Sequence, residues 1–334
     1  MLDPFQYDLP AEKIAQRPVY PYDSAKLLVV DTAESNLTES VFTDLASFLE
    51  PNDLLVFNDT AVSPARLFGR FADSEGQVEV LLVEQTSSDT WQCLARPLKK
   101  FRAGREIQFA SQLMATIGER SDKLVSLKFN SAEKLQSAGT MPIPPYIRGG
   151  KSDEQDTLDY QTHFAKTAGN GSIAAPTASL HFTPELVATI KSKGIQTINL
   201  TLHVGLASFL PLWNDSVENL TPPGKEEFVV EESTWQTISN HKSTGGRVIA
   251  VGTTVVRALE SRVREMEGET ELFITPGFDF KMVDAMVTNF HQPATTHLLL
   301  VEAFIGKDLL RESYEYAIRN DFRFLSYGDG MLLV

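Results

Sequence analysis

Four side chains that can hold or exchange a proton stand where the sequence predicts strands or helices to begin or end. They are Asp59, His181, His203 and His291. Imidazole gains and loses a proton near neutral pH, so histidines at such positions suit general acid–base catalysis. Each one alone is more often structural than catalytic. Their shared placement beside Gly, Thr and Asn residues favours a functional site.

The stretch from Gly171 to Thr183 carries no charged side chain and is rich in small residues, which let a ligand approach the backbone closely. It ends at Thr183, Pro184 and Glu185, a typical signal for the start of a helix. The backbone N–H groups of that helix would face the stretch and favour an anionic or polar ligand. The alternative is a tight, buried connection in which His181 is part of the core.

Two polar clusters follow predicted buried strands. Residues 54–57 lead into Asn58–Thr60, and residues 247–251 lead into Gly252–Thr254 at the start of a helix. Open α/β sheets place their ligands at the carboxyl ends of strands, so both clusters are candidates for ligand binding. Asn58–Thr60 fits an Asx-type turn equally well. A single glycine at 252 falls far short of a dinucleotide-binding fingerprint.

The segment 64–130 differs in texture from the rest of the chain. It contains six short runs rich in aromatic or β-branched residues, separated by Ser, Asp and Gly turns. Strands at this spacing, with no helical period between them, predict a small antiparallel β-barrel. On both sides of it, strand-like and helix-like runs alternate as in α/β folds. We therefore predict a discontinuous α/β domain, residues 1–63 and 151–334, with a barrel inserted at 64–150.

The charge is unevenly distributed. A net charge of −14 argues against broad, nonspecific affinity for nucleic acid. The segment 64–130 nevertheless holds ten basic and eight acidic residues, so a polyanionic partner should prefer it. One loop between predicted strands is a plausible phosphate-contacting loop, although a solvated surface loop would look similar. Its cations are Arg96, Lys99, Lys100, Arg102 and Arg105.

Several classes of site are not indicated. The six histidines lack metal-ligand spacing, and a single cysteine, Cys93, excludes an internal disulfide. No run approaches the roughly 18 apolar residues of a membrane helix, and Met1–Pro4 does not open a signal peptide. We expect a cytoplasmic monomer with no metal and no membrane partner.

Eight motifs, in order along nearly the whole chain, resemble the S-adenosylmethionine:tRNA ribosyltransferase-isomerases of queuosine biosynthesis, the QueA family. The block from Gly171 to Thr183 is the most specific of them. The motifs are Leu55–Thr60, Arg96–Lys100, Pro142–Ile147, Gly171–Thr183, Thr201–Gly205, Val251–Thr254, Thr288–His291 and Phe322–Asp329.

The resemblance implies an α/β domain interrupted by a β-barrel, in agreement with the texture change. It also implies that the ribosyl part of S-adenosylmethionine, the co-substrate, is transferred to and isomerised on 7-aminomethyl-7-deazaguanine in tRNA. The products would be epoxyqueuosine in the tRNA, adenine and methionine. The chemistry would begin with removal of a proton beside the sulfonium, which requires a positioned base.

Candidate roles follow from placing these motifs on the sequence. His181 or His203 would be the base, and Asp59 would act with them in catalysis. The cations of the loop at 96–105 would contact tRNA. Substrate-binding candidates are Asn58, Thr60, Ser172, Pro176, Thr177, Thr253, Thr254, Asn289, His291 and Asp329.

Three segments depart from the family pattern. Gly224 and Lys225 stand where the family usually has Met-His, Leu210 replaces an arginine and Ala294 replaces a lysine. Lost cations and a lost imidazole bear on binding of tRNA and of a methionine carboxylate. The alternatives are a diverged paralogue that uses S-adenosylmethionine with another, small-molecule acceptor, and a binding protein without catalysis.

Overall fold

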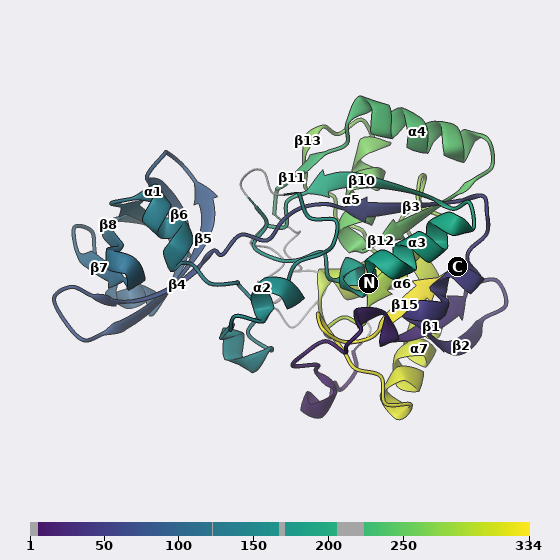
Figure 1. Cartoon of the computed structure of the whole chain (residues 1–334), viewed down its shortest axis with the longest axis horizontal. Coiled ribbons are helices and arrows are strands. Elements are labelled where there is room, and N and C mark those ends of the chain that lie inside the picture. Colours follow the sequence, from purple (N-terminus) through teal and green to yellow (C-terminus); the bar gives the residue numbers. More distant parts are fainter. Residues whose placement is uncertain (1–5, 122, 167–170, 206–223) are drawn as a thin grey trace.

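The computed structural model describes residues 6–121, 123–166, 171–205 and 224–334. A mixed sheet with helices on both faces makes up the larger part, and a closed barrel projects from it (Figure 1). The sheet order is β13-β11-β10-β3-β12-β14-β15-β1-β2. Its strands are β1 Lys26–Asp31, β2 Asn36–Val41, β3 Asp53–Asn58, β10 Gln196–Leu202, β11 Glu226–Val229, β12 Arg247–Val251, β13 Gly268–Thr270, β14 Ala285–Asn289 and β15 Gly330–Leu333.

The barrel confirms the fold expected for the inserted segment. Six strands close in the order β4-β5-β6-β9-β8-β7, and every neighbouring pair is antiparallel. Apolar side chains that alternate along these strands fill the interior as a core separate from that of the sheet. The strands are β4 Arg66–Phe71, β5 Gln77–Gln85, β6 Thr90–Arg96, β7 Glu106–Phe109, β8 Met114–Arg120 and β9 Val125–Phe129.

The centre of the sheet is parallel, which explains why the polar motifs meet. Strands β10, β3, β12 and β14 run in the same direction, so their carboxyl ends lie at one edge. Strand β15 runs antiparallel to β14 and pairs Gly330 with Asn289, so the chain just before β15 reaches the same edge. We call this the carboxyl edge of the sheet.

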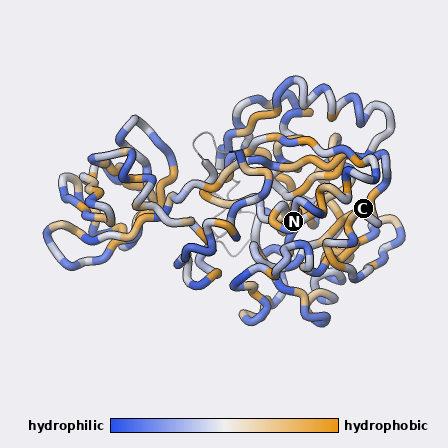
Figure 2. Tube along the Cα trace, in the orientation of Figure 1, coloured by the Kyte–Doolittle hydropathy of each residue, from blue (hydrophilic) through white to orange (hydrophobic). Residues whose placement is uncertain are grey.

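Helices cover both faces of the sheet because its central strands are apolar on both sides. In β3, Leu54 and Val56 pack into the core shared with α4 to α7, whereas Leu55 and Phe57 pack into the core shared with α3. Figure 2 shows apolar residues concentrated along these strands. The helices are α1 Ala132–Ala138, α2 Asp156–Asp159, α3 Pro184–Ser192, α4 Glu232–Ser243, α5 Thr253–Arg262, α6 Thr296–Ile305 and α7 Lys307–Arg319.

The structure confirms one predicted helix start and contains helices that the sequence pattern did not predict. The predicted helix start at Thr183 is confirmed, because its hydroxyl accepts a hydrogen bond from Leu186 N at 3.1 Å. Residues Phe42–Phe48 form a 3-10 helix that has no side-chain cap. Helix α4 was not predicted because Ile238 is its only buried residue, so it lacks an apolar stripe.

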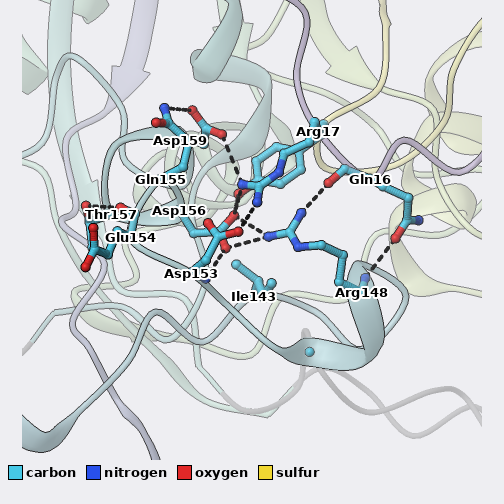
Figure 3. A network of polar contacts seen from close by, with 12 residues as sticks. Gln16, Arg17, Ile143, Arg148, Asp153, Glu154, Gln155, Asp156, Thr157 and Asp159 are labelled. Atoms are coloured by element: carbon cyan, nitrogen blue, oxygen red, sulfur yellow. Dashed lines mark hydrogen bonds and ion pairs between the residues drawn. The ribbon is translucent and has the colours of Figure 1, made fainter.

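A buried network of ion pairs and hydrogen bonds connects residues 148–159, which follow the barrel, to Arg17 near the N-terminus (Figure 3). Asp156, whose side chain is fully buried, accepts hydrogen bonds from Arg148, from Arg17 at 3.2 Å and from the Tyr327 hydroxyl at 2.9 Å. Asp159 accepts one from the Tyr20 hydroxyl at 2.6 Å. These contacts hold three distant parts of the chain together beside the carboxyl edge.

Among the described residues, no helix has both the length and the apolar character needed to cross a membrane.

Candidate functional site

Asn58 at the end of β3 holds neighbouring elements in place. Its Nδ2 donates to Leu202 O at 2.9 Å and to Thr254 Oγ1 at 3.3 Å, and its Oδ1 accepts from Leu202 N at 3.0 Å and Thr60 N at 3.1 Å. The side chain is completely buried. All of its bonding groups are therefore used to align β10 and the start of α5.

Asp59 is a buried carboxylate at the carboxyl edge. Its Oδ1 accepts a hydrogen bond from Thr201 Oγ1 at 2.6 Å, and its Oδ2 lies 2.6 Å from Lys166 Nζ. The carboxylate is fully buried, whereas the Lys166 side chain is 63% exposed. The hydrogen bond to Asp59 raises the pKa of Lys166. Among the described residues, Lys166 is thus the cation that neutralises this buried anion, and it reaches Asp59 from the surface.

A hydrogen-bonded chain links Thr60, Ser172 and His203. Thr60 Oγ1 lies 2.8 Å from Ser172 Oγ and 2.9 Å from His203 Nδ1. Ser172 Oγ in turn accepts from Val204 N at 2.8 Å. Thr60 and Ser172 are buried and the His203 ring is partly exposed. This chain joins three of the motif segments.

His181 sits in a different environment. Its ring stacks on Phe42 with centroids 4.0 Å apart, and Asn289 Nδ2 lies 3.3 Å from its Nε2. Burial lowers the pKa of His181 to about 3, against a smaller opposing effect of a hydrogen bond to the Tyr22 backbone. Thr177 Oγ1 donates to Asn289 Oδ1 at 2.8 Å. The imidazole is therefore neutral near pH 7 and is a weak base.

A small hollow lies beside His181. Its lining includes Tyr22, Leu180, Arg323 and Tyr327. Asp329 is a substrate-binding candidate, but its carboxylate is used within the protein. It accepts hydrogen bonds from Arg323 N at 2.7 Å and from Lys26 N at 3.0 Å. Burial raises the pKa of Asp329.

The third histidine of the predicted set, His291, is half-buried. His291 Nε2 lies 2.8 Å from Thr288 Oγ1, and its backbone N donates to the Tyr314 hydroxyl at 2.9 Å. Its ring stacks on that of His297 with centroids 5.3 Å apart. Burial lowers the pKa of His291 well below its ordinary value and that of His297 to about 4. Both rings are neutral near pH 7.

The remaining small-residue candidates lie at the same edge. Pro176 is buried just before the 3-10 helix Thr177–His181, and Thr253 is the buried first residue of α5. Gly252 precedes α5 with φ of 95°, a left-handed conformation that favours glycine. The structure brings Thr254 to the cluster around Asn58, where its hydroxyl accepts from Asn58 Nδ2 at 3.3 Å.

Two ion pairs at this edge were not predicted from the sequence. Arg257 on α5 forms an ion pair with the buried Glu226, and Glu226 Oε1 accepts from Gly205 N at 3.1 Å. Lys166, which pairs with Asp59, was the other. The sequence signal was slight: a cation one turn into the helix that follows Gly252, and another shortly before Gly171.

The cations of the basic loop of the barrel are of two kinds. Arg96, Lys99, Lys100 and Arg102 are exposed, and no ion pair forms at them with any described residue. Arg105 instead binds Asp73 through Nε at 2.8 Å, and its guanidinium lies 3.5 Å from the centroid of the Phe71 ring.

Two altered segments fall within the described residues and one does not. Lys225 is exposed and pairs with Glu269 at 2.9 Å, and Ala294 has a positive φ of 56°. Residues 208–211 lie outside the described residues. In the part of the chain that the structure describes, no three His, Cys, Asp or Glu side chains gather as metal ligands would.

Comparison with known proteins covers the whole chain. The sequence model of a family described as "Queuosine biosynthesis protein" matches residues 2–333. Among solved structures, the chain is similar to an S-adenosylmethionine tRNA ribosyltransferase from Thermotoga maritima. The two are 35% identical, the match covers 99% of each chain, and the TM-score is 0.57.

Proposed function

This chain belongs to the queuosine biosynthesis protein family, and we propose that it is an S-adenosylmethionine:tRNA ribosyltransferase-isomerase. It transfers the ribosyl group of S-adenosylmethionine to 7-aminomethyl-7-deazaguanine in tRNA and isomerises it. Adenine and methionine leave, and epoxyqueuosine remains in the tRNA. The S-adenosylmethionine is consumed as a co-substrate.

The observation that carries this proposal is the convergence of separate motif segments on one sheet edge. Asn58–Thr60 from β3, Ser172 from the small-residue stretch, His203 after β10 and Thr254 from α5 are joined by hydrogen bonds of 2.8–3.3 Å. The carboxyl ends of parallel strands are where α/β sheets bind their ligands. Buried, preorganised polar groups also suit the stabilisation of charge that develops during a reaction.

Asp59 is the group best suited to the positive charges of the two substrates. S-adenosylmethionine carries a sulfonium, and the acceptor base carries an aminomethyl group. A buried carboxylate is costly without a cation, and here Lys166 supplies it from the surface. We propose that Asp59 binds a cationic group of a substrate and that this group displaces Lys166 from Asp59 when it binds.

The barrel loop is the proposed tRNA contact. Arg96, Lys99, Lys100 and Arg102 are exposed, so their charges are available to phosphates. We propose that the protein acts as a monomer. It would act in the cytoplasm, where its tRNA substrate is found.

Nucleoside mass spectrometry tests this function. The purified protein is incubated with S-adenosylmethionine and with tRNA that carries 7-aminomethyl-7-deazaguanine. We expect this nucleoside to be replaced by epoxyqueuosine. Unchanged tRNA, under conditions in which the Thermotoga maritima enzyme is active, would refute the proposal. Adenine release with unchanged tRNA would point to a different acceptor.

A further inference from the structure

We propose that Thr60 and Ser172 fix His203 as a neutral hydrogen-bond donor that acts through Nε2, rather than as a general base. The evidence is the direction of the hydrogen bonds in the chain Val204–Ser172–Thr60–His203. The assignment of the ring proton rests on this geometry alone. Its use in catalysis rests also on the proposed function.

The direction of the chain is set at its backbone end. The N–H of Val204 can only donate, and its hydrogen bond to Ser172 Oγ is 2.8 Å long. Ser172 Oγ is therefore an acceptor at this contact, and its own hydrogen must go elsewhere. The acceptor within reach is Thr60 Oγ1 at 2.8 Å.

Thr60 passes this direction on to the histidine. Because Thr60 Oγ1 receives the hydrogen of Ser172, its own hydroxyl hydrogen is free to donate to His203 Nδ1 at 2.9 Å. Nδ1 is then an acceptor and carries no hydrogen. A neutral imidazole with a bare Nδ1 carries its proton on Nε2.

The opposite direction leaves a hydrogen bond unmade. If Nδ1 carried the proton, it would donate to Thr60, and Thr60 would donate to Ser172. Ser172 would then accept twice, and no described residue would accept its hydrogen. If Ser172 still donated to Thr60, the hydrogen of Thr60 would instead lack an acceptor among the described residues. Ser172 is only 1% exposed, so an unmatched hydroxyl hydrogen there is unfavourable. Protonating both nitrogens of His203 forces the same reversal.

The consequence concerns the role of His203 in the reaction. No described residue binds Nε2 of His203, and the ring is partly exposed, so its N–H is available to a ligand. A neutral donor stabilises an acceptor atom that gains negative charge, as in an oxyanion hole. In the proposed reaction such atoms are a ring nitrogen of departing adenine and a ribose oxygen. Thr60 and Ser172 are positioning residues for this donor.

The tautomer of His203 can be measured directly by ¹⁵N NMR on protein labelled at histidine, with the His203 signals assigned by their loss in His203→Gln. We expect the wild-type ring to carry its proton on Nε2. Thr60→Val removes the donor to Nδ1 and should give a mixture of tautomers, whereas Thr60→Ser should keep the wild-type state. Thr254→Val, which removes another hydroxyl at the same edge, should also leave it unchanged.

Two results would overturn the assignment: a wild-type ring protonated on Nδ1, or a Thr60→Val protein with the wild-type tautomer. If Thr60→Val does not fold, Thr60→Ala provides the same test, because it also removes the hydroxyl that donates to Nδ1. The wild-type spectrum decides the direction of the chain in either case.

Kinetics then separate a donor from a base. The amide of His203→Gln can replace an Nε2 donor but cannot replace a general base. We expect His203→Ala to lower kcat about 10²–10³-fold, the usual effect of losing one such donor, with little change in KM. His203→Gln should retain at least about tenfold more activity than His203→Ala.

An equal loss in both variants would overturn the donor role. If the wild-type protein releases no adenine at all, the proposed function fails, and the NMR result still decides the tautomer.

Discussion

The carboxyl edge of the sheet and the basic loop of the barrel hold their polar groups in opposite ways. At the sheet edge, Asn58, Asp59 and Thr60 are buried and bonded to neighbouring groups. On the barrel loop, Lys99, Lys100 and Arg102 are exposed and lack an ion pair with any described residue. Buried, fixed dipoles suit chemistry, whereas exposed cations bind a polyanion with strong salt dependence.

This difference indicates a division of labour between catalysis and affinity. The barrel is inserted between β3 and the small-residue stretch, and it has its own core. Changes at one region should therefore affect rate and changes at the other should affect tRNA binding.

The largest effect is expected for Asp59→Asn. The variant keeps the size of the side chain but removes a buried negative charge that pairs with Lys166. Truncating one partner of a buried charge pair typically costs 2–5 kcal/mol, so we expect kcat/KM for S-adenosylmethionine to fall by about 10²-fold or more. Affinity for tRNA should be unchanged. A protein with normal kcat/KM and weakened tRNA binding would contradict the division.

The second effect concerns the barrel. Each lost phosphate contact should reduce the slope of log affinity against log salt by about 0.7–0.9. The triple variant Lys99→Ala, Lys100→Ala and Arg102→Ala should therefore reduce this slope by about 2.1–2.7 in a titration by fluorescence anisotropy. At saturating tRNA its kcat should stay near that of the wild type. An unchanged salt slope would show that tRNA binds elsewhere.

A matched pair within the loop sharpens this result. Arg102 is exposed and has no ion-pair partner among the described residues, whereas Arg105 binds Asp73 and lies over the Phe71 ring. Arg102→Ala should reduce the salt slope by about 0.7–0.9, and Arg105→Ala should leave it unchanged while lowering the melting temperature slightly. If both variants change the slope equally, the Asp73 pair opens when tRNA binds.

The smallest effect should come from His181, and it should appear in the pH dependence of stability. Burial lowers the pKa of His181 to about 3, whereas the unfolded chain binds a proton with a pKa near 6.5. Unfolding at pH 5 therefore takes up about one proton here. This contribution to stability is complete above pH 6.5 and is lost as the pH falls toward 3.

His181→Asn should remove that proton uptake. The melting temperature of the variant should fall less steeply between pH 7 and pH 5 than that of the wild type. Some slope should remain, because burial also lowers the pKa of His291 and His297. A slope equal to that of the wild type would mean that His181 is protonated in the folded protein.

Much of this architecture could be predicted from short-range patterns. Six runs separated by turn residues predicted the barrel, and buried strands that end at Asn58 or just before Gly252 predicted polar clusters at the carboxyl edge. Contacts between distant segments could not be predicted in this way. Lys166 meets Asp59, and Glu226 meets Arg257, although the partners lie far apart in the sequence.

The state of the histidines was also beyond the sequence. The pattern placed His181 and His203 at element ends but could not show that one stacks on Phe42 while the other ends a chain of hydroxyl groups. Burial and hydrogen-bond direction, which depend on the folded structure, distinguish a buried neutral ring from a ring positioned to donate.

The most direct test of the central claim is adenine release from S-adenosylmethionine, measured with tRNA carrying 7-aminomethyl-7-deazaguanine, with tRNA lacking that base, and without tRNA. In the proposed reaction, one adenine is released for each epoxyqueuosine formed. Of the three samples, only the one with modified tRNA should show turnover. The triple barrel variant should approach the wild-type rate at saturating tRNA and low salt. Equal release in all three samples, or no release with the modified tRNA, would contradict the account.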